Sequence, residues 1–104
     1  MSSFDDRAKS FENKFAHDAE MQFKAEARRN KLLGLWAAGL LGKSDDEAAA
    51  YVTEVIKSDF EEAGDEDVFR KLAKDLAGRA DEATIRSKMA TLLVEAKAQV
   101  MTEL

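Results

Sequence analysis

Apolar side chains recur every three or four residues over most of the chain, which is the spacing of one face of an α-helix. Three glycines, Gly42, Gly64 and Gly78, follow the ends of apolar stretches, where glycine commonly ends a helix. The pattern therefore predicts helices over residues 19–41, 45–62, 66–77 and 82–103.

Polar residues after these glycines are suited to begin the next helix. Ser44, with Glu47 three positions later, forms a capping-box pattern in which each side chain binds a backbone N–H near the other residue. Asp65 and Asp81 are expected to cap the two following helices. The absence of proline and the small number of turn residues support the same all-α prediction.

Each predicted helix has one apolar face, and four such faces joined by short loops describe a four-helix bundle. Gly34 and Gly39 lie inside the first helix, where each costs about 1 kcal/mol relative to alanine. Close approach of a second helix would explain both glycines. The residues expected in the core are Leu32, Leu33, Trp36, Ala37, Leu40, Ala48, Tyr51, Val52, Val55, Ile56, Phe60, Val68, Phe69, Leu72, Ala73, Leu76, Ile85, Met89, Leu92, Leu93, Ala96 and Val100.

The first 18 residues have a different pattern, because three phenylalanines stand in the polar stretch FDDRAKSFENKF. On a helix, Phe4, Phe11 and Phe15 would lie within about 60° of one another. This apolar seam lapses near residues 22–30, before the core face of the first helix begins. We therefore predict a bundle domain over 19–104, preceded by a mobile or loosely helical arm over 1–18 that becomes helical in a partner's groove. The alternative is that the arm folds back onto the core.

Composition narrows the classes of function. The chain has 104 residues, 45% of them apolar, which suits one small domain. Its net charge of −5 argues against nucleic-acid binding. There is no cysteine, and His17 is the single histidine, so neither a metal site nor a catalytic triad is expected. The longest apolar run contains two glycines and is too short to span a membrane. We expect a cytoplasmic protein that is not an enzyme.

Two stretches resemble ligand-binding loops only superficially. AAGLLGKS, residues 37–44, is close to a phosphate-binding loop, but it lacks the first glycine and follows a helix instead of a strand. DFEEAGDED, residues 59–67, has the composition of a calcium loop without the ordered ligand spacing. We interpret both stretches as helix ends and caps.

Basic residues cluster in KAEARRNK, residues 24–31, whereas residues 43–67 carry ten acidic residues and two basic ones. Lys24, Arg28 and Lys31 share one helix face. Arg29 and Asn30 flank this face. Two interpretations remain open at this stage. The cluster is either solvated and paired with the acidic segment, or it is a site for a phosphate or carboxylate group.

In the second interpretation, an aromatic ring near the basic cluster would stack on a nucleotide base. Phe23 and Trp36 are the two candidates. No residue pattern in the chain predicts a catalytic site.

Three stretches, SFDDRAKSFENKFAHDAE, FKAEARRNKLLGLWAAGLLGKS and DFEEAGDEDVFRKLAKDL, resemble the zeta subunits that regulate α-proteobacterial F-type ATP synthases. The resemblance covers nearly the whole chain. It implies a four-helix bundle whose N-terminal segment inhibits ATP hydrolysis by the catalytic head, formed by the alpha, beta and gamma subunits. The segment would wedge between catalytic subunits and block rotation, and the protein would associate peripherally with the membrane-bound synthase.

Carried over to this sequence, the resemblance makes residues 2–20 the inhibitory segment. Its expected contacts are Phe4, Arg7, Phe11, Lys14, Phe15 and His17. The family is also described as binding adenine nucleotides weakly. The second functional hypothesis is therefore a regulatory module that binds ADP or ATP, with the arm packed on the bundle. From charge alone, its nucleotide site would comprise Lys24, Arg28, Arg29, Asn30 and Lys31.

Overall fold

The computed structural model describes residues 18–61 and 64–103. These residues form four helices and no strand, which confirms the all-α prediction for this part of the chain. The predicted arm contacts, Phe4, Arg7, Phe11, Lys14, Phe15 and His17, lie outside the described residues. The helices are α2 (Ala19–Leu40), α3 (Asp45–Ser58), α4 (Glu66–Asp75) and α5 (Glu82–Thr102).

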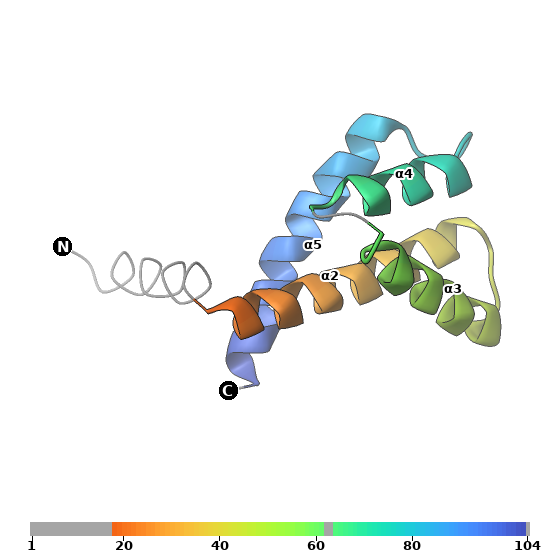
Figure 1. Ribbon diagram of the computed structural model, residues 1–104. Helices are drawn as coiled ribbons and strands as arrows, with labels where there is room; N and C mark the ends of the chain where they lie inside the picture. The colour runs from red at the N-terminus through yellow and green to blue at the C-terminus, as the bar shows by residue number, and fades with distance from the viewer. Residues whose placement is uncertain (1–17, 62–63, 104) are drawn as a thin grey trace.

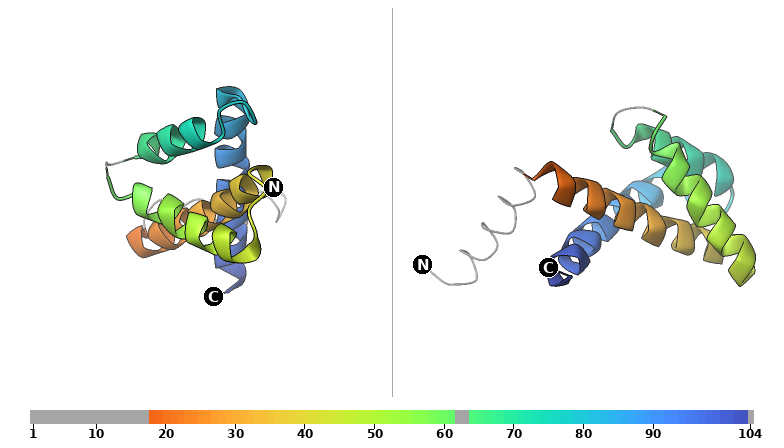
Figure 2. Two further views of the ribbon diagram at one scale, coloured as in Figure 1. Left: turned by 90° about the vertical axis from the view of Figure 1, so that its right-hand side faces the viewer. Right: turned by 60° about the horizontal axis from the view of Figure 1, so that its bottom comes forward.

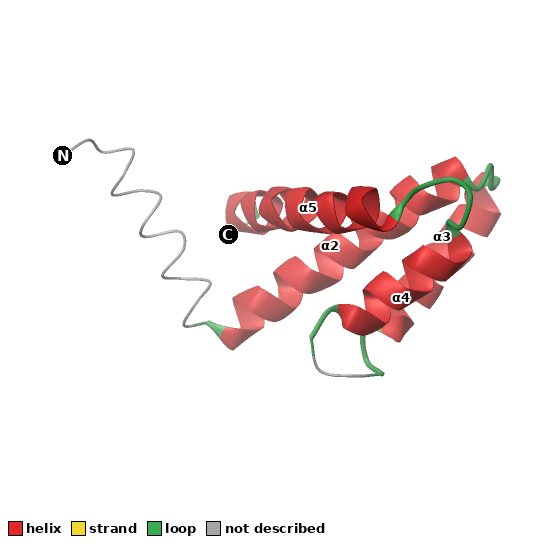
Figure 3. Ribbon diagram, turned by 90° about the horizontal axis from the view of Figure 1, so that it is seen from above, coloured by secondary structure: helices red, strands yellow, loops and turns green. Residues whose placement is uncertain are grey.

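Helix α2 is the central element of the bundle, because both α3 and α5 pack mainly against it. Helix α3 returns beside the later part of α2, and α5 crosses α2 obliquely (Figures 1 and 2). The shorter α4 joins α3 to α5 at one end of the bundle. The view from above shows that α3 and α4 do not reach the beginning of α2 (Figure 3).

The predicted helix starts are confirmed at α3 and α5. At α3, the Glu47 backbone N–H donates to Ser44 Oγ at 3.4 Å, and the Ser44 N–H donates to Glu47 Oε1 at 2.9 Å. Asp81 accepts a hydrogen bond from the Thr84 N–H at 2.7 Å. Asp65 occupies the N-cap position of α4 as predicted, but its side chain makes no hydrogen bond to the start of that helix. Its carboxylate is instead held by Arg29 at 3.0 Å.

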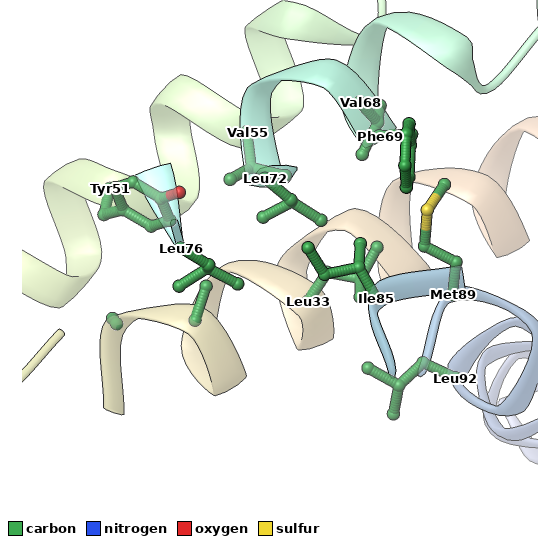
Figure 4. Close-up of a cluster of buried hydrophobic side chains, with 12 residues drawn as sticks. Leu33, Tyr51, Val55, Val68, Phe69, Leu72, Leu76, Ile85, Met89 and Leu92 are labelled. Carbon is green, nitrogen blue, oxygen red and sulfur yellow. The ribbon is translucent and has the colours of Figure 1, made fainter. Parts of the chain in front are cut away.

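The main core lies where α2, α3, α4 and α5 meet, and it consists almost entirely of side chains from the predicted faces. Figure 4 shows Leu33, Leu72 and Ile85 pointing toward one another from three different helices. Two core predictions are wrong. Leu40 is 41% exposed in the last turn of α2, and Phe60 is 69% exposed because α3 ends at Ser58, four residues before the predicted end at 62.

A second, smaller core extends the buried face of α2 toward its beginning. Met21 and Ala25 pack against Val100 near the end of α5. The inferred lapse of the apolar face over residues 22–30 is therefore wrong for α2. Burial continues through Met21 and Ala25 to the side chain of Arg29, while Gln22 lies on the exposed side.

The two glycines inside α2 have different surroundings. A Cβ at Gly34 would lie 2.9 Å from Val52 Cα, so this glycine permits the close approach of α3 that the sequence predicted. Nothing lies within 4 Å of the corresponding position at Gly39, where the prediction of a close helix contact is wrong. Gly42, with φ of 70°, ends α2 as predicted.

Candidate functional site: the basic segment of α2 and the groove beside it

The structure divides the basic segment of α2 into a buried part and an exposed part. Arg29 is 1% exposed and Asn30 is equally buried. The Arg29 guanidinium donates to Asn30 Oδ1 and lies near two carboxylates, Asp65 at 3.0 Å and Asp59 at 3.9 Å. Asn30 in turn donates to Asp59 at 2.9 Å. These two residues therefore tie the acidic connection between α3 and α4 to α2.

Lys24, Arg28 and Lys31 face outward and line one pocket of about 300 Å³. Arg28 donates to Gln99 at 2.8 Å and pairs with Glu103 at 2.6 Å, which links α2 to the end of α5. Lys24 forms an exposed pair with Glu20 one turn earlier, at 3.4 Å, of a kind that contributes little to stability. The structure thus brings three of the five predicted nucleotide-site residues together and separates Arg29 and Asn30 from that pocket.

The floor of this pocket is apolar. It is formed by Phe23 and Ala27 of α2, Ile56 of α3 and Val100 of α5. Phe23, whose ring is predicted to stack on a base, therefore lies at the pocket, and its side chain is 58% exposed. Trp36, the other candidate, packs against the main core, with the Lys88 ammonium 5.8 Å from its ring centre.

A second, smaller hollow of about 50 Å³ adjoins the first pocket. The two hollows share Phe23, Ala27 and Ile56, and Phe60 lines the second. We call this continuous surface the α2–α3 groove. The sequence did not reveal it, because Ile56 and Phe60 were assigned to the core. Phe60 is uncovered because it lies past the end of α3, and the sequence does not show where that helix ends.

Carboxylates also line the groove: Glu26 and Asp59 line the smaller hollow, and Glu103 lines the pocket with the basic residues. Burial raises the pKa of the Glu26 carboxyl group, and the nearby Arg29 guanidinium only partly offsets this effect. Burial also raises the pKa of Asp59, against the opposing effect of its hydrogen bond from Asn30. The groove therefore has an apolar floor, a basic edge and a partly desolvated acidic edge.

Among the helices that the structure describes, none is long and apolar enough to cross a membrane. In the same part of the chain, no group of three or more acidic, histidine or cysteine side chains is arranged to hold a metal ion. A small helical bundle whose exposed aromatic rings lie beside charged side chains has the surface of a domain that binds another molecule.

The particular family follows from comparison with known proteins. The chain belongs to the family of ATPase inhibitor subunit zeta, whose family model matches residues 1–99. A protein chain whose structure was determined by solution NMR is 64% identical in sequence to the present chain. The match covers 81% of the present chain and 99% of the NMR chain, with a TM-score of 0.74. Comparison with curated proteins found no match. Membership in this family gives the protein an inhibitory, regulatory role.

Proposed function

We propose that the protein inhibits ATP hydrolysis by the catalytic head of the F-type ATP synthase, and that residues 1–18 are the inhibitory element. The observation that carries this proposal is the family match over residues 1–99, which includes the whole arm. Partners are the alpha, beta and gamma subunits of the head. The site of action is the cytoplasmic side of the membrane-bound synthase.

The start of α2 supports a division between arm and bundle at this point of the chain. Asp18 has an extended backbone, with φ of −116° and ψ of 99°, and its side chain accepts a hydrogen bond from the Met21 N–H at 3.0 Å. This is an N-cap, so α2 has its own start and does not require a preceding helical turn. In the proposed mechanism the bundle is the anchor and the arm becomes helical between two catalytic subunits.

The arm's phenylalanine seam supplies the driving force for this ordering. Fixing the backbone costs about 1–2 kcal/mol per residue, and burial of Phe4, Phe11 and Phe15 in the interface must offset that cost. Arg7, Lys14 and His17 would add contacts with charged groups of the head. The stalled rotor then prevents hydrolysis.

The test is ATP hydrolysis by the purified catalytic head in the presence of the full-length protein and of a variant lacking residues 2–17, which keeps the Asp18 cap of α2. We expect inhibition by the full-length chain and none by the truncated chain. The truncated chain should keep a helical circular dichroism spectrum, and its unfolding midpoint should match that of the full-length protein. Equal inhibition by both proteins at the same concentration would overturn the arm mechanism.

The second candidate function is binding of an adenine nucleotide in the pocket at Lys24, Arg28 and Lys31. It is favoured by the presence of three basic side chains and the exposed Phe23 ring around one space of about 300 Å³. Titration of ADP or ATP into the free protein should shift the backbone amide signals of these residues. A Lys31→Ala variant should bind more weakly, whereas shifts confined to other helices would exclude this pocket.

A further inference from the structure

The face of α2 that packs on α3 is longer than α3 itself. Helix α2 has 22 residues and α3 has 14. At Gly34, α3 approaches closely through Val52. Nearer the start of α2, Asn30, Ala27 and Phe23 line one hollow together with Ile56 of α3 and with Phe60, which lies past the end of α3. The first turns of this face therefore have no helix of the described chain covering them, as Figure 3 shows.

Two exposed aromatic side chains lie at this position. Phe23 and Phe60 are 58% and 69% exposed, and they line the same hollow although they come from separate parts of the chain. Aromatic rings gathered in this way are typical anchors of a protein interface. A helix laid in line with α3 would cover both rings and restore the packing that α2 has farther along.

The charges beside the rings indicate what kind of helix fits. Lys24, Arg28 and Lys31 form one edge of the groove in a chain of net charge −5. The Lys24 and Arg28 side chains remain 52% and 28% exposed despite their pairs with Glu20 and Glu103. An amphipathic helix with an apolar stripe and an acidic flank on this edge would be complementary.

We propose that the α2–α3 groove is a second docking surface, separate from the arm, which takes an acidic-flanked amphipathic helix on the ATPase head. This inference rests on the proposed inhibition of that enzyme. The groove begins at Phe23, close in sequence to Asp18, where the described chain meets the arm. A bundle held there would keep the arm near its own site and raise its effective concentration.

Phe60→Ala is the most informative variant, because Phe60 lines the hollow shared with Phe23 but not the larger basic pocket. Val94→Ala is the matched control, since Val94 is also 69% exposed and lies on α5 outside the groove. Lys31→Glu tests the basic edge, with Arg79→Glu as a control for the same change in charge on an exposed residue.

The experiment measures the affinity of full-length variants for the purified catalytic head, together with inhibition of ATP hydrolysis. Phe60→Ala and Lys31→Glu should each weaken binding by about ten-fold, the scale of one anchoring residue. Val94→Ala and Arg79→Glu should bind as the unchanged protein does. The unfolding midpoints of the two alanine variants should remain equal, which excludes a general loss of structure.

Two results would overturn the proposal in distinguishable ways. If the unchanged protein inhibits the head and Phe60→Ala binds equally well, the groove is not a docking surface, and the inhibitory function still stands. If the unchanged protein neither binds nor inhibits the head, both the docking surface and the proposed function fail.

Discussion

The guanidinium of Arg29 lies 3.0 Å from the carboxylate of Asp65, so a fully buried side chain of α2 holds the residue that precedes α4. The same guanidinium is oriented by Asn30 and lies 3.9 Å from Asp59 at the end of α3. One arginine thus fixes both ends of the acidic connection between α3 and α4. A buried charge of this kind requires all of its partners.

Replacing Arg29 with methionine should therefore destabilise the bundle strongly. The change leaves Asp59 and Asn30 without their cation, and we expect the free energy of unfolding to fall by about 2–3 kcal/mol. Urea denaturation measures this loss. Arg79→Met is the control, because Arg79 is exposed and its replacement should alter the free energy of unfolding by less than about 0.5 kcal/mol. Equal effects of the two substitutions would contradict the assigned role of Arg29.

The two glycines of α2 should respond oppositely to alanine. At Gly34 a Cβ would lie 2.9 Å from the Val52 backbone, so Gly34→Ala should force α2 and α3 apart and cost about 1–3 kcal/mol. At Gly39 the added methyl group meets nothing, and Gly39→Ala should stabilise the helix by up to about 1 kcal/mol. Thermal unfolding of both variants gives the comparison, and a stabilised Gly34→Ala protein would disprove the close contact.

Stability should depend on pH through Glu26 and Asp59. Burial raises the pKa of both carboxyl groups above their ordinary values of 4.5 and 3.8. The folded state therefore binds these protons more tightly than the unfolded chain does. Their contribution to stability is complete below those ordinary values and is lost as the pH rises through the raised ones.

A Glu26→Gln variant isolates this effect, because glutamine carries no titrating proton. As the pH rises from about 4 to 6, the free energy of unfolding of the variant should fall less than that of the unchanged protein. Comparison of the two proteins is needed because Asp81, Glu47 and Glu66 have lowered pKa values and act in the opposite direction. Parallel pH profiles would show that Glu26 has an ordinary pKa.

Tyr51 joins α3 to α4 through a hydrogen bond to a carboxylate. Its hydroxyl group donates to Asp75 Oδ2 at 2.8 Å, and Lys71 also donates to that oxygen at 3.0 Å. Tyr51→Phe keeps the buried ring and should cost about 1 kcal/mol, since Asp75 retains Lys71 as a partner. Carboxyl NMR should also show a higher pKa for Asp75, because both hydrogen bonds help to lower it against the effect of burial. An unchanged pKa would indicate that the Tyr51 hydroxyl does not stabilise this carboxylate.

Most of the fold could be predicted from the sequence, because helix ends and apolar faces depend on neighbouring residues. Ser44 and Asp81 cap helices as their local patterns indicate, and the core faces of α4 and α5 are as predicted. Phe60 was misplaced because nothing in the local pattern shows that α3 ends at Ser58. The burial of Met21 and Ala25 was not predicted because their partner, Val100, is distant in sequence.

The candidate site was predicted less completely than the fold. Charge clustering found Lys24, Arg28 and Lys31, which the structure gathers at one pocket. It also included Arg29, which follows Arg28 by one residue and whose side chain is therefore directed into the interior. Sequence spacing shows which residues share a helix face, but only the positions of α3 and α5 decide which face is covered.

The ion pair at Arg29 also bears on the order of events in folding. Its partners, Asp59 and Asp65, approach only after α3 has packed against α2 and the chain has turned toward α4. We therefore predict that these contacts form after the rate-limiting step of folding, with a φ-value near zero at Arg29. Loss of the Arg29 side chain is therefore expected to accelerate unfolding while leaving the refolding rate nearly unchanged. The ion pairs of Arg29 would thus control the lifetime of the folded domain more than the rate at which it folds.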